Sequence, residues 1–358
     1  MTNKFTVSGF CTYSRIFLYL NFFDFRLIFF VKLLEKTLLE SFRGILLFLY
    51  VCLDMYFQGF GMRVRRVSAW GFHPFDRDGE RSEVEWCFTS KHGVGELPKA
   101  SEHGERRIVG AVVPHAGLAY SGPIAAHTYY SLAKDGIPET FVIIGVNHRG
   151  YPGFNTMLEG IWRMPLGDVE VDSDLAKEVA KNSEFVDINP DAHDQEHSIE
   201  VQLPFLQYIY DESFKIVPIT VGYGDYGMCE NVGKAIAKAS RDERKDIVVL
   251  GSTDFIHYGP NYGYAPVGMK PFEKVLKWMN DADKSIIDTI LTLDAEKLVN
   301  VVQEKGYTMC GSLPVATMIV AAKELGAKEA KLLKYGTSYD TGGSTDLIVG
   351  YGSIVILR

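Results

Sequence analysis

The sequence predicts an α/β fold in which a central, mostly parallel or mixed sheet is flanked by helices. One observation behind this prediction is that apolar runs of strand length alternate with helix-like stretches from about residue 107 onward. A second is that Val and Ile fill these runs almost continuously, which is typical of strands buried on both faces. The predicted strands are residues 107–113, 140–146, 214–222, 246–252 and 347–357.

The predicted helices lie between these strands. Asp172 or Ser173 is suited to cap the helix that follows it, and Gly136 is suited to end the helix before it. Residues 155–172 contain a Leu-Gly-Asp turn and predict a hairpin beside the main sheet. The predicted helices are residues 123–136, 173–182, 197–210, 229–243, 271–291 and 313–326.

The first 61 residues differ from the rest because they are crowded with Phe, Leu, Ile and Tyr. Asp24 and Arg26 interrupt the first apolar run, and residues 44–53 are fewer than the roughly 20 that a transmembrane helix needs. We therefore expect residues 1–61 to be a hydrophobic N-terminal extension, either accessory or outside the native product, and residues 62–358 to form a single domain. An amphipathic helix at a membrane surface is the alternative for the extension.

The composition of the 358-residue chain limits the classes of partner. Hydrophobic residues make up 47% and charged residues 23%, as in globular proteins, and the net charge of −8 disfavours binding to nucleic acid. The five cysteines are scattered without a C-x-x-C pair, so neither a disulfide framework nor a zinc knuckle is expected. We expect a cytoplasmic protein that binds a small molecule or a peptide, with no nucleic-acid partner and no stable membrane span in the core domain.

Histidines follow the ends of three predicted strands. His115 follows residues 107–113, His148 follows residues 140–146, and Asp254 and His257 follow the strand at 246–252. Ligands of open α/β sheets bind outside the carboxyl ends of the strands. These side chains are therefore expected at one edge of the sheet, with His257 and Asp254 as a general acid/base pair.

Cys310 lies at the start of a predicted helix, where the positive end of the helix dipole favours a thiolate. Two imidazoles and an anionic ligand leave coordination positions open on a metal ion, and a thiolate shifts the preference toward Cu(I), Zn or Fe(II). A buried, apolar cysteine is the structural alternative.

A further cluster lies in residues 191–200, where His193 and His197 would be one turn apart on a helix. The order H-D-Q-E-H departs from H-E-x-x-H, which disfavours a zincin. We expect this segment to form a pocket wall, with His197 and Glu200 as substrate contacts or supporting contacts. Asn147 and Tyr120 are assigned to the same substrate pocket.

Five ordered blocks together resemble the Memo family, whose bacterial and archaeal members are also called AmmeMemoRadiSam system protein B. The blocks are PHAGLAYSGPIAAHTY, IIGVNHRG, DQEHSIEVQLPFLQ, GSTDFIHYG and TMCGSLPVATMI. The resemblance covers residues 62–358 and implies a fold similar to class III extradiol dioxygenases. It also implies that His115, His148 and Cys310 hold a metal, with Asp254 and His257 beside them in the pocket.

The function implied by this resemblance is that of a metal-binding protein with a mononuclear site of two histidines and one cysteine. The metal would be iron or copper, with zinc as an alternative, and the chemistry would be redox or dioxygenase-like on an unknown small molecule. Two alternatives remain open. One is a non-catalytic binding or scaffold module that uses the pocket for a peptide or metabolite, and the other is nucleophilic chemistry by Cys310 with His257 as its base.

Overall fold

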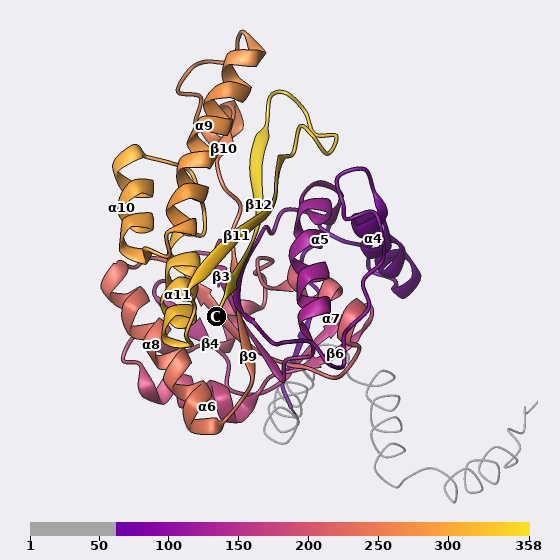
Figure 1. Cartoon of the computed structure of the whole chain (residues 1–358), viewed down its shortest axis with the longest axis vertical. Helices are drawn as coiled ribbons and strands as arrows, with labels where there is room; N and C mark the ends of the chain where they lie inside the picture. Colours follow the sequence, from indigo (N-terminus) through magenta and orange to yellow (C-terminus); the bar gives the residue numbers. More distant parts are fainter. Residues whose placement is uncertain (1–61) are drawn as a thin grey trace, which may run out of the picture. The chain divides into compact units, whose positions relative to one another are not determined.

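The apolar runs form the strands of one large mixed sheet, as predicted (Figure 1). The structure is a computed structural model that describes residues 62–358, and the extension expected in residues 1–61 lies outside the described residues. Each predicted strand is found within one residue of its expected bounds. The strands are β2 (Ile108–Val113), β3 (Thr140–Val146), β8 (Lys215–Val221), β9 (Ile247–Ser252) and β12 (Ile348–Leu357).

The centre of the sheet is parallel and its borders are antiparallel. The order β2-β9-β3-β8 is joined by parallel pairing, with Val112 opposite Gly251 and Phe141 opposite Val248. β12 runs antiparallel to β2 and carries the antiparallel partners β10 (His257–Tyr258) and β11 (Glu329–Thr337). Beyond β8 lie β4 (Phe154–Thr156), which is antiparallel to it, and β7 (Val186–Ile188). The parallel centre places the carboxyl ends of β2, β3 and β9 at the same edge.

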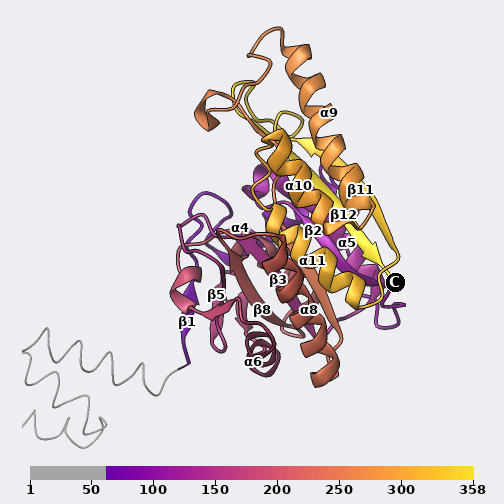
Figure 2. The same cartoon turned by 90° about the vertical axis from the view of Figure 1, so that its left-hand side faces the viewer.

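Helices cover both faces of this sheet (Figures 1 and 2). On one face α5 packs on β2 and β12 and contacts α4 and α7, whereas on the other α11 packs on β9 and β2 and contacts α8 and α10. Asp172 caps α6 through the N–H of Leu175, and Gly136 ends α5 with a φ of 116°, as expected. The bounds are α4 (Arg77–Thr89), α5 (Leu118–Asp135), α6 (Ser173–Asn182), α7 (Leu203–Tyr210), α8 (Tyr226–Glu243), α9 (Phe272–Leu291), α10 (Ala295–Lys305) and α11 (Ser312–Glu324).

The predicted hairpin is present in a separate three-stranded sheet. β5 (Ile161–Met164) and β6 (Gly167–Glu170) pair antiparallel, and β1 (Val64–Arg66) joins β5 in parallel. Arg65 of β1 is almost fully buried and forms an ion pair with Glu200. This ion pair ties the small sheet to the segment that precedes α7.

The helix predicted over residues 197–210 is wrong in its first half. The chain forms two short 3₁₀ helices, η1 (Pro190–His193) and η2 (Glu200–Gln202), and α7 begins only at Leu203. The carbonyl of Ser198, which a regular helix would pair with the N–H of Gln202, accepts instead from the Oγ of Ser252 at 2.7 Å and from the side-chain Nε2 of Gln202 at 3.3 Å. The N–H of Gln202 bonds to the carbonyl of Ile199 at 3.1 Å, which is the tighter 3₁₀ pattern.

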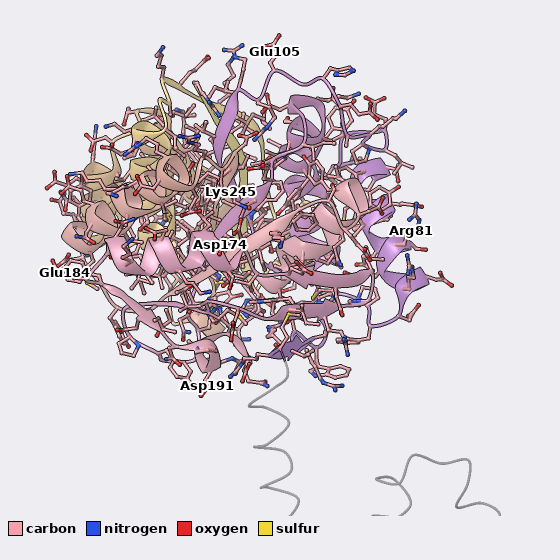
Figure 3. All side chains as sticks on the ribbon, turned by 90° about the horizontal axis from the view of Figure 1, so that it is seen from below. Arg81, Glu105, Asp174, Glu184, Asp191 and Lys245 are labelled. Carbon is pink, nitrogen blue, oxygen red and sulfur yellow. The ribbon has the colours of Figure 1, made fainter. Side chains whose placement is uncertain are left out.

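Charged side chains of both signs lie at the surface in the view of Figure 3. Among the labelled residues, Arg81 pairs with Glu85 one helical turn away at 3.2 Å, and Lys245 pairs with Asp172 at 3.3 Å. Within residues 62–358, none of the helices combines the length and apolar character that crossing a membrane requires.

Candidate metal centre

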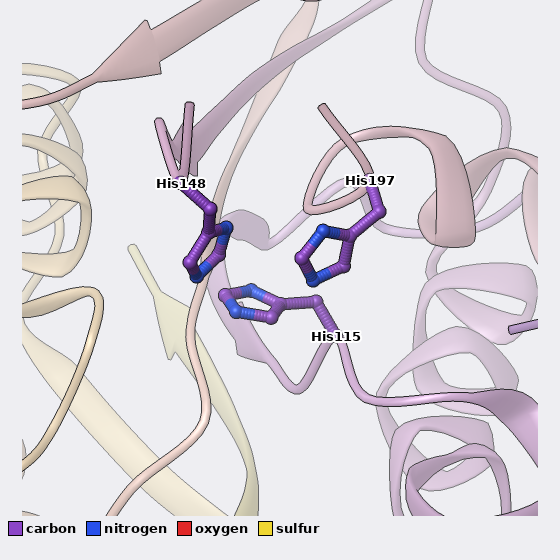
Figure 4. Close-up of side chains that lie close together, drawn as sticks. All are labelled: His115, His148 and His197. Atoms are coloured by element: carbon purple, nitrogen blue, oxygen red, sulfur yellow. The ribbon is translucent and has the colours of Figure 1, made fainter. Parts of the chain in front are cut away.

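Three imidazoles meet at the carboxyl edge of the parallel strands (Figure 4). His115 follows the end of β2, His148 follows the end of β3, and His197 lies in the irregular segment between η1 and η2. One ring nitrogen from each of the three lies within 4.8 Å of the other two. The rings of His148 and His197 are stacked with centroids 4.6 Å apart, and the ring of His115 is nearly perpendicular to both. The edge of the sheet therefore brings His115 and His148 together as expected, and it adds His197.

The hydrogen bonds of His115 define which of its nitrogens is free. Its Nδ1 lies 2.9 Å from the Oγ of Ser252, and that hydroxyl donates its single proton to the carbonyl of Ser198 at 2.7 Å. The hydroxyl must therefore accept from Nδ1–H, which leaves a lone pair on Nε2. Burial lowers the pKa of His115 well below its ordinary value, so the ring is neutral and able to bind a metal.

Glu196 engages the other two histidines. Its Oε1 lies 3.0 Å from Nδ1 of His148 and 3.3 Å from Nδ1 of His197, and its Oε2 accepts the backbone N–H of His148 at 2.6 Å. Burial alone would raise the pKa of Glu196, but the hydrogen bond and charge of His148 outweigh it and lower the pKa to about 2. Burial also lowers the pKa of His197 to about 4. Both histidines thus lie beside an anionic carboxylate near their Nδ1 atoms.

His257 has a defined tautomer as well. Its Nδ1 lies 3.1 Å from the carbonyl of Phe255 and 3.0 Å from the carbonyl of Thr308. Because a carbonyl only accepts, Nδ1 carries a proton, and Nε2 of the neutral ring has a free lone pair. His257 lines the same cavity as the three clustered histidines and can accept a proton from a molecule bound there.

Asp254 supports the loop of His115. Its Oδ1 accepts the backbone N–H of His115 at 2.8 Å and that of Ala116 at 3.3 Å. Burial raises the pKa of Asp254, and the nearby charge of His257 opposes this shift. Asp254 therefore fixes the chain that carries His115 and lies beside His257 in the same cavity.

A cavity of about 650 Å³ lies over the histidines. Of the residues expected in the substrate pocket, His197 and Tyr120 line it, and Tyr120 is about half-exposed at its wall. The ring of Phe72 packs against that of His197 with centroids 4.4 Å apart. The lining residues are Gly71, Phe72, His115, Ala116, Gly117, Tyr120, His148, His197, Asp254, His257, Tyr262, Ser338, Gly343, Ser344, Leu347, Val349 and Tyr351.

Two residues expected in the substrate pocket do not line this cavity. Glu200 is fully buried, and its carboxylate is bound by Arg65, by Nε2 of His73 and by the N–H groups of Ser68 and Ala69. The side chain of Asn147 donates to the carbonyl of Ala192 and accepts from the N–H groups of Arg149 and Tyr151. All of these partners are protein groups, so both side chains support the surrounding loops, and a contact of either residue with substrate stays a prediction.

Cys310 lies two residues before α11, next to His115. Its Sγ is 3.3 Å from Nε2 of His115 and accepts the backbone N–H of Asp254 at 3.4 Å. The expectation that the helix end lowers the thiol pKa is wrong for the metal-free site, because burial and the charge of Asp254 raise the pKa of Cys310 to about 12. Deprotonation of this thiol therefore needs a bound cation.

His197 was expected only as a pocket contact, although it belongs to the compact histidine group. The sequence carried a weak signal for it, because residues 191–200 hold five more ionisable residues besides His197: Asp191, His193, Asp194, Glu196 and Glu200. His193 is fully buried beside Trp162, with ring centroids 5.9 Å apart, and is not part of the group. The tertiary fold, and not the spacing in the sequence, therefore decides that His197 belongs to the histidine group and that His193 does not.

Comparison with known proteins gives the family. The family profile described as Memo-like protein matches residues 68–355. A MEMO1 family protein of Methanopyrus kandleri is 42% identical over 288 residues, which cover 80% of this chain and 96% of the relative. The MEMO1 family protein of Thermococcus onnurineus is 45% identical over 271 residues, covering 72% and 90%.

Among solved structures, an uncharacterised protein from Escherichia coli K12 matches 70% of this chain and 100% of its own length. Its TM-score of 0.42 and sequence identity of 14% support no conclusion about the site. The family profile covers the part of the chain that carries the histidine cluster and Cys310. The chain belongs to the Memo family.

Proposed function

We propose that this chain is a mononuclear transition-metal protein with redox or dioxygenase-like chemistry on a small molecule. The proposed ligands are His115, His148 and Cys310, with His197 as an additional imidazole. The observation that supports this proposal most strongly is the group of three imidazoles with ring nitrogens within 4.8 Å of one another, beneath a cavity of about 650 Å³. A cavity of this size is in the range of small-molecule sites.

The donor set fits such a metal. Metal–imidazole bonds are about 2.0–2.1 Å long, so donor atoms this close together can reach one ion after small side-chain rotations. Nδ1 of His115 is bound to Ser252 and Nδ1 of His148 to Glu196, which leaves their Nε2 lone pairs for the metal. Imidazoles suit iron, copper and zinc, and a thiolate favours Cu(I) and Zn. We propose iron or copper, with zinc as the alternative.

A bound iron or copper ion would supply the redox capacity, and the protein would supply orientation and proton transfer. His257, with Nδ1–H held by two carbonyls, would accept a proton at Nε2 from a hydroxyl of the bound molecule. Asp254 would keep His115 in place through two backbone N–H groups. Phe72 and Tyr351 would contribute apolar surface around the bound molecule.

Metal analysis of protein purified without oxygen tests this proposal. We expect about one equivalent of iron or copper in the wild type, a large loss in His115→Ala and His148→Ala, and nearly full occupancy in His257→Gln. Circular dichroism of each variant serves as the check on folding. A wild type that holds no more iron, copper or zinc than His115→Ala contradicts the proposal.

Oxygen uptake separates an enzyme from a binding module. With the metal-loaded protein and a panel of small aromatic diols, an enzyme consumes oxygen, and His257→Gln consumes it roughly 10²- to 10⁴-fold more slowly at the same metal content. If the protein binds members of the panel but consumes no oxygen with any of them, the result favours a non-catalytic binding module.

A further inference from the structure

Glu196 was not among the residues expected to act at the site, although no other described carboxylate contacts two of the clustered histidines. It is fully buried in the segment that carries His197, and its side chain contacts His148, which follows the end of β3. Glu196 does not line the cavity, so it does not reach a bound small molecule directly. Any effect of Glu196 on the chemistry must therefore pass through other residues.

The contacts of Glu196 are distributed over both of its oxygens. Oε2 accepts the backbone N–H of His148 at 2.6 Å. Oε1 accepts the N–H groups of His197 and Ser198, each at 2.8 Å, and Nδ1 of His148 at 3.0 Å. Three backbone donors thus fix the carboxylate, and the carboxylate in turn fixes the ring of His148.

The consequence for the metal site concerns the tautomer of the imidazole. An anionic oxygen beside Nδ1 requires a proton on that nitrogen and leaves the lone pair on Nε2. The same oxygen lies 3.3 Å from Nδ1 of His197, which favours the same arrangement there. A carboxylate bound to the rear nitrogen of a ligating histidine also raises its basicity toward the metal.

We propose that Glu196 is the positioning residue of the metal centre: it holds His148 with Nδ1 protonated and Nε2 free to bind the ion, and it anchors the backbone of His197. The predicted effect of Glu196 on metal affinity rests on the proposed function, because it requires a metal at this site. The tautomer itself is a property of the metal-free protein and can be measured without a metal.

The test compares two glutamate variants of the full chain. In Glu196→Gln, the side-chain amide can present either its oxygen or its NH₂ group to Nδ1 of His148, so the variant no longer requires a proton on that nitrogen. Glu184→Gln is the matched control, because Glu184 is exposed and lies on the surface. Glu200→Gln is a second control, since Glu200 is equally buried in the same segment but contacts no clustered histidine.

The first readout is the ¹⁵N NMR spectrum of the imidazoles in metal-free protein labelled at histidine. The chain has nine histidines, and His148→Gln assigns the signal of His148. We expect protonated Nδ1 and unprotonated Nε2 for His148 in the wild type, in Glu184→Gln and in Glu200→Gln. Glu196→Gln should show a mixture or the opposite tautomer. A wild-type His148 protonated at Nε2 overturns the proposal without recourse to any variant.

The second readout is the dissociation constant for Co²⁺, used as a spectroscopic probe. We expect Glu196→Gln to weaken binding about 10- to 100-fold and the Glu184→Gln control to bind as the wild type does. An unchanged tautomer together with an affinity within about threefold of the wild type contradicts the role of Glu196. If the wild type binds neither Co²⁺ nor iron, copper or zinc, the proposed metal function fails, and the NMR result alone decides the role of Glu196.

Discussion

The Sγ of Cys310 and the Nε2 of His115 are 3.3 Å apart, where the chain after β2 meets the chain before α11. The two residues are separated by 195 positions in the sequence. The pairing places a sulfur donor beside an unprotonated ring nitrogen, because Nδ1 of His115 is bound to Ser252. Burial raises the pKa of the metal-free thiol, and a bound cation would favour the thiolate.

The first prediction follows from this pair. Cys310→Ser should lose the thiolate-to-cobalt charge-transfer absorption of the Co²⁺-loaded protein and bind Co²⁺ at least about tenfold more weakly, because only imidazole donors remain. Absorption titration checks both. Cys229→Ser is the matched control, since Cys229 is buried in α8 with its sulfur next to the carbonyl of Leu313. Persistence of the charge-transfer band in Cys310→Ser excludes Cys310 as a ligand.

The second prediction concerns the buried ion cluster around Glu200. Glu200→Gln leaves the guanidinium of Arg65, which is almost fully buried, without its anionic partner. Removal of one member of a buried ion pair costs about 3–5 kcal/mol of the free energy of unfolding. Urea unfolding measures this loss. Glu230→Gln, which removes only an exposed pair with Lys234, should leave the free energy of unfolding nearly unchanged. Equal losses in the two variants contradict the assigned role of Glu200.

The third prediction uses the pH dependence of His73. Burial alone would lower its pKa, but hydrogen bonds to Glu200 and Glu80 raise it to about 9. A pKa raised above the unfolded value of about 6.5 gives stability that is fully present below that pH and is lost as the pH rises through 9. The difference in unfolding free energy between wild type and His73→Gln should therefore be larger near pH ~6 than near pH ~10. A difference that is constant over this range shows that His73 is neutral in the fold.

The fourth prediction concerns Asp283 of α9, which is fully buried where α9 packs against β11 and β12. Burial raises its pKa to about 7, although the N–H of Ile256 and the hydroxyl of Tyr335 oppose the shift. The folded state thus holds a proton that the unfolded chain releases above about pH 4, so stability falls as the pH rises through 7. In Asp283→Asn this fall, up to about 1.4 kcal/mol per pH unit, should disappear. Unfolding curves from pH ~5 to ~8 measure this fall. If the unfolding free energies of the wild type and Asp283→Asn change in parallel with pH, Asp283 does not have the raised pKa.

Much of the sheet could be predicted because its strands are buried on both faces. Such strands consist of continuous apolar residues, and this composition is visible without any partner. β11 was missed for the opposite reason: its outer residues are exposed, and Lys331 and Lys334 interrupt its pattern. The irregular segment before α7 was missed because the carbonyl of Ser198 is bound by the side chains of Ser252 and Gln202, and a contact with the distant Ser252 is not encoded in helix propensity.

The sequence by itself determined which side chains lie at the carboxyl edge of the sheet, because a residue that directly follows a parallel strand must lie at that edge. His115 and His148 were placed in this way. Tertiary structure alone decided that His197 joins them, that Glu196 supports them and that Glu200 does not line the cavity. These three residues lie within five positions of one another, and their roles differ because each meets a different partner brought from a distant part of the chain. Contacts of that kind depend on the packing of β1, β3 and β9 and leave no periodic pattern in the sequence.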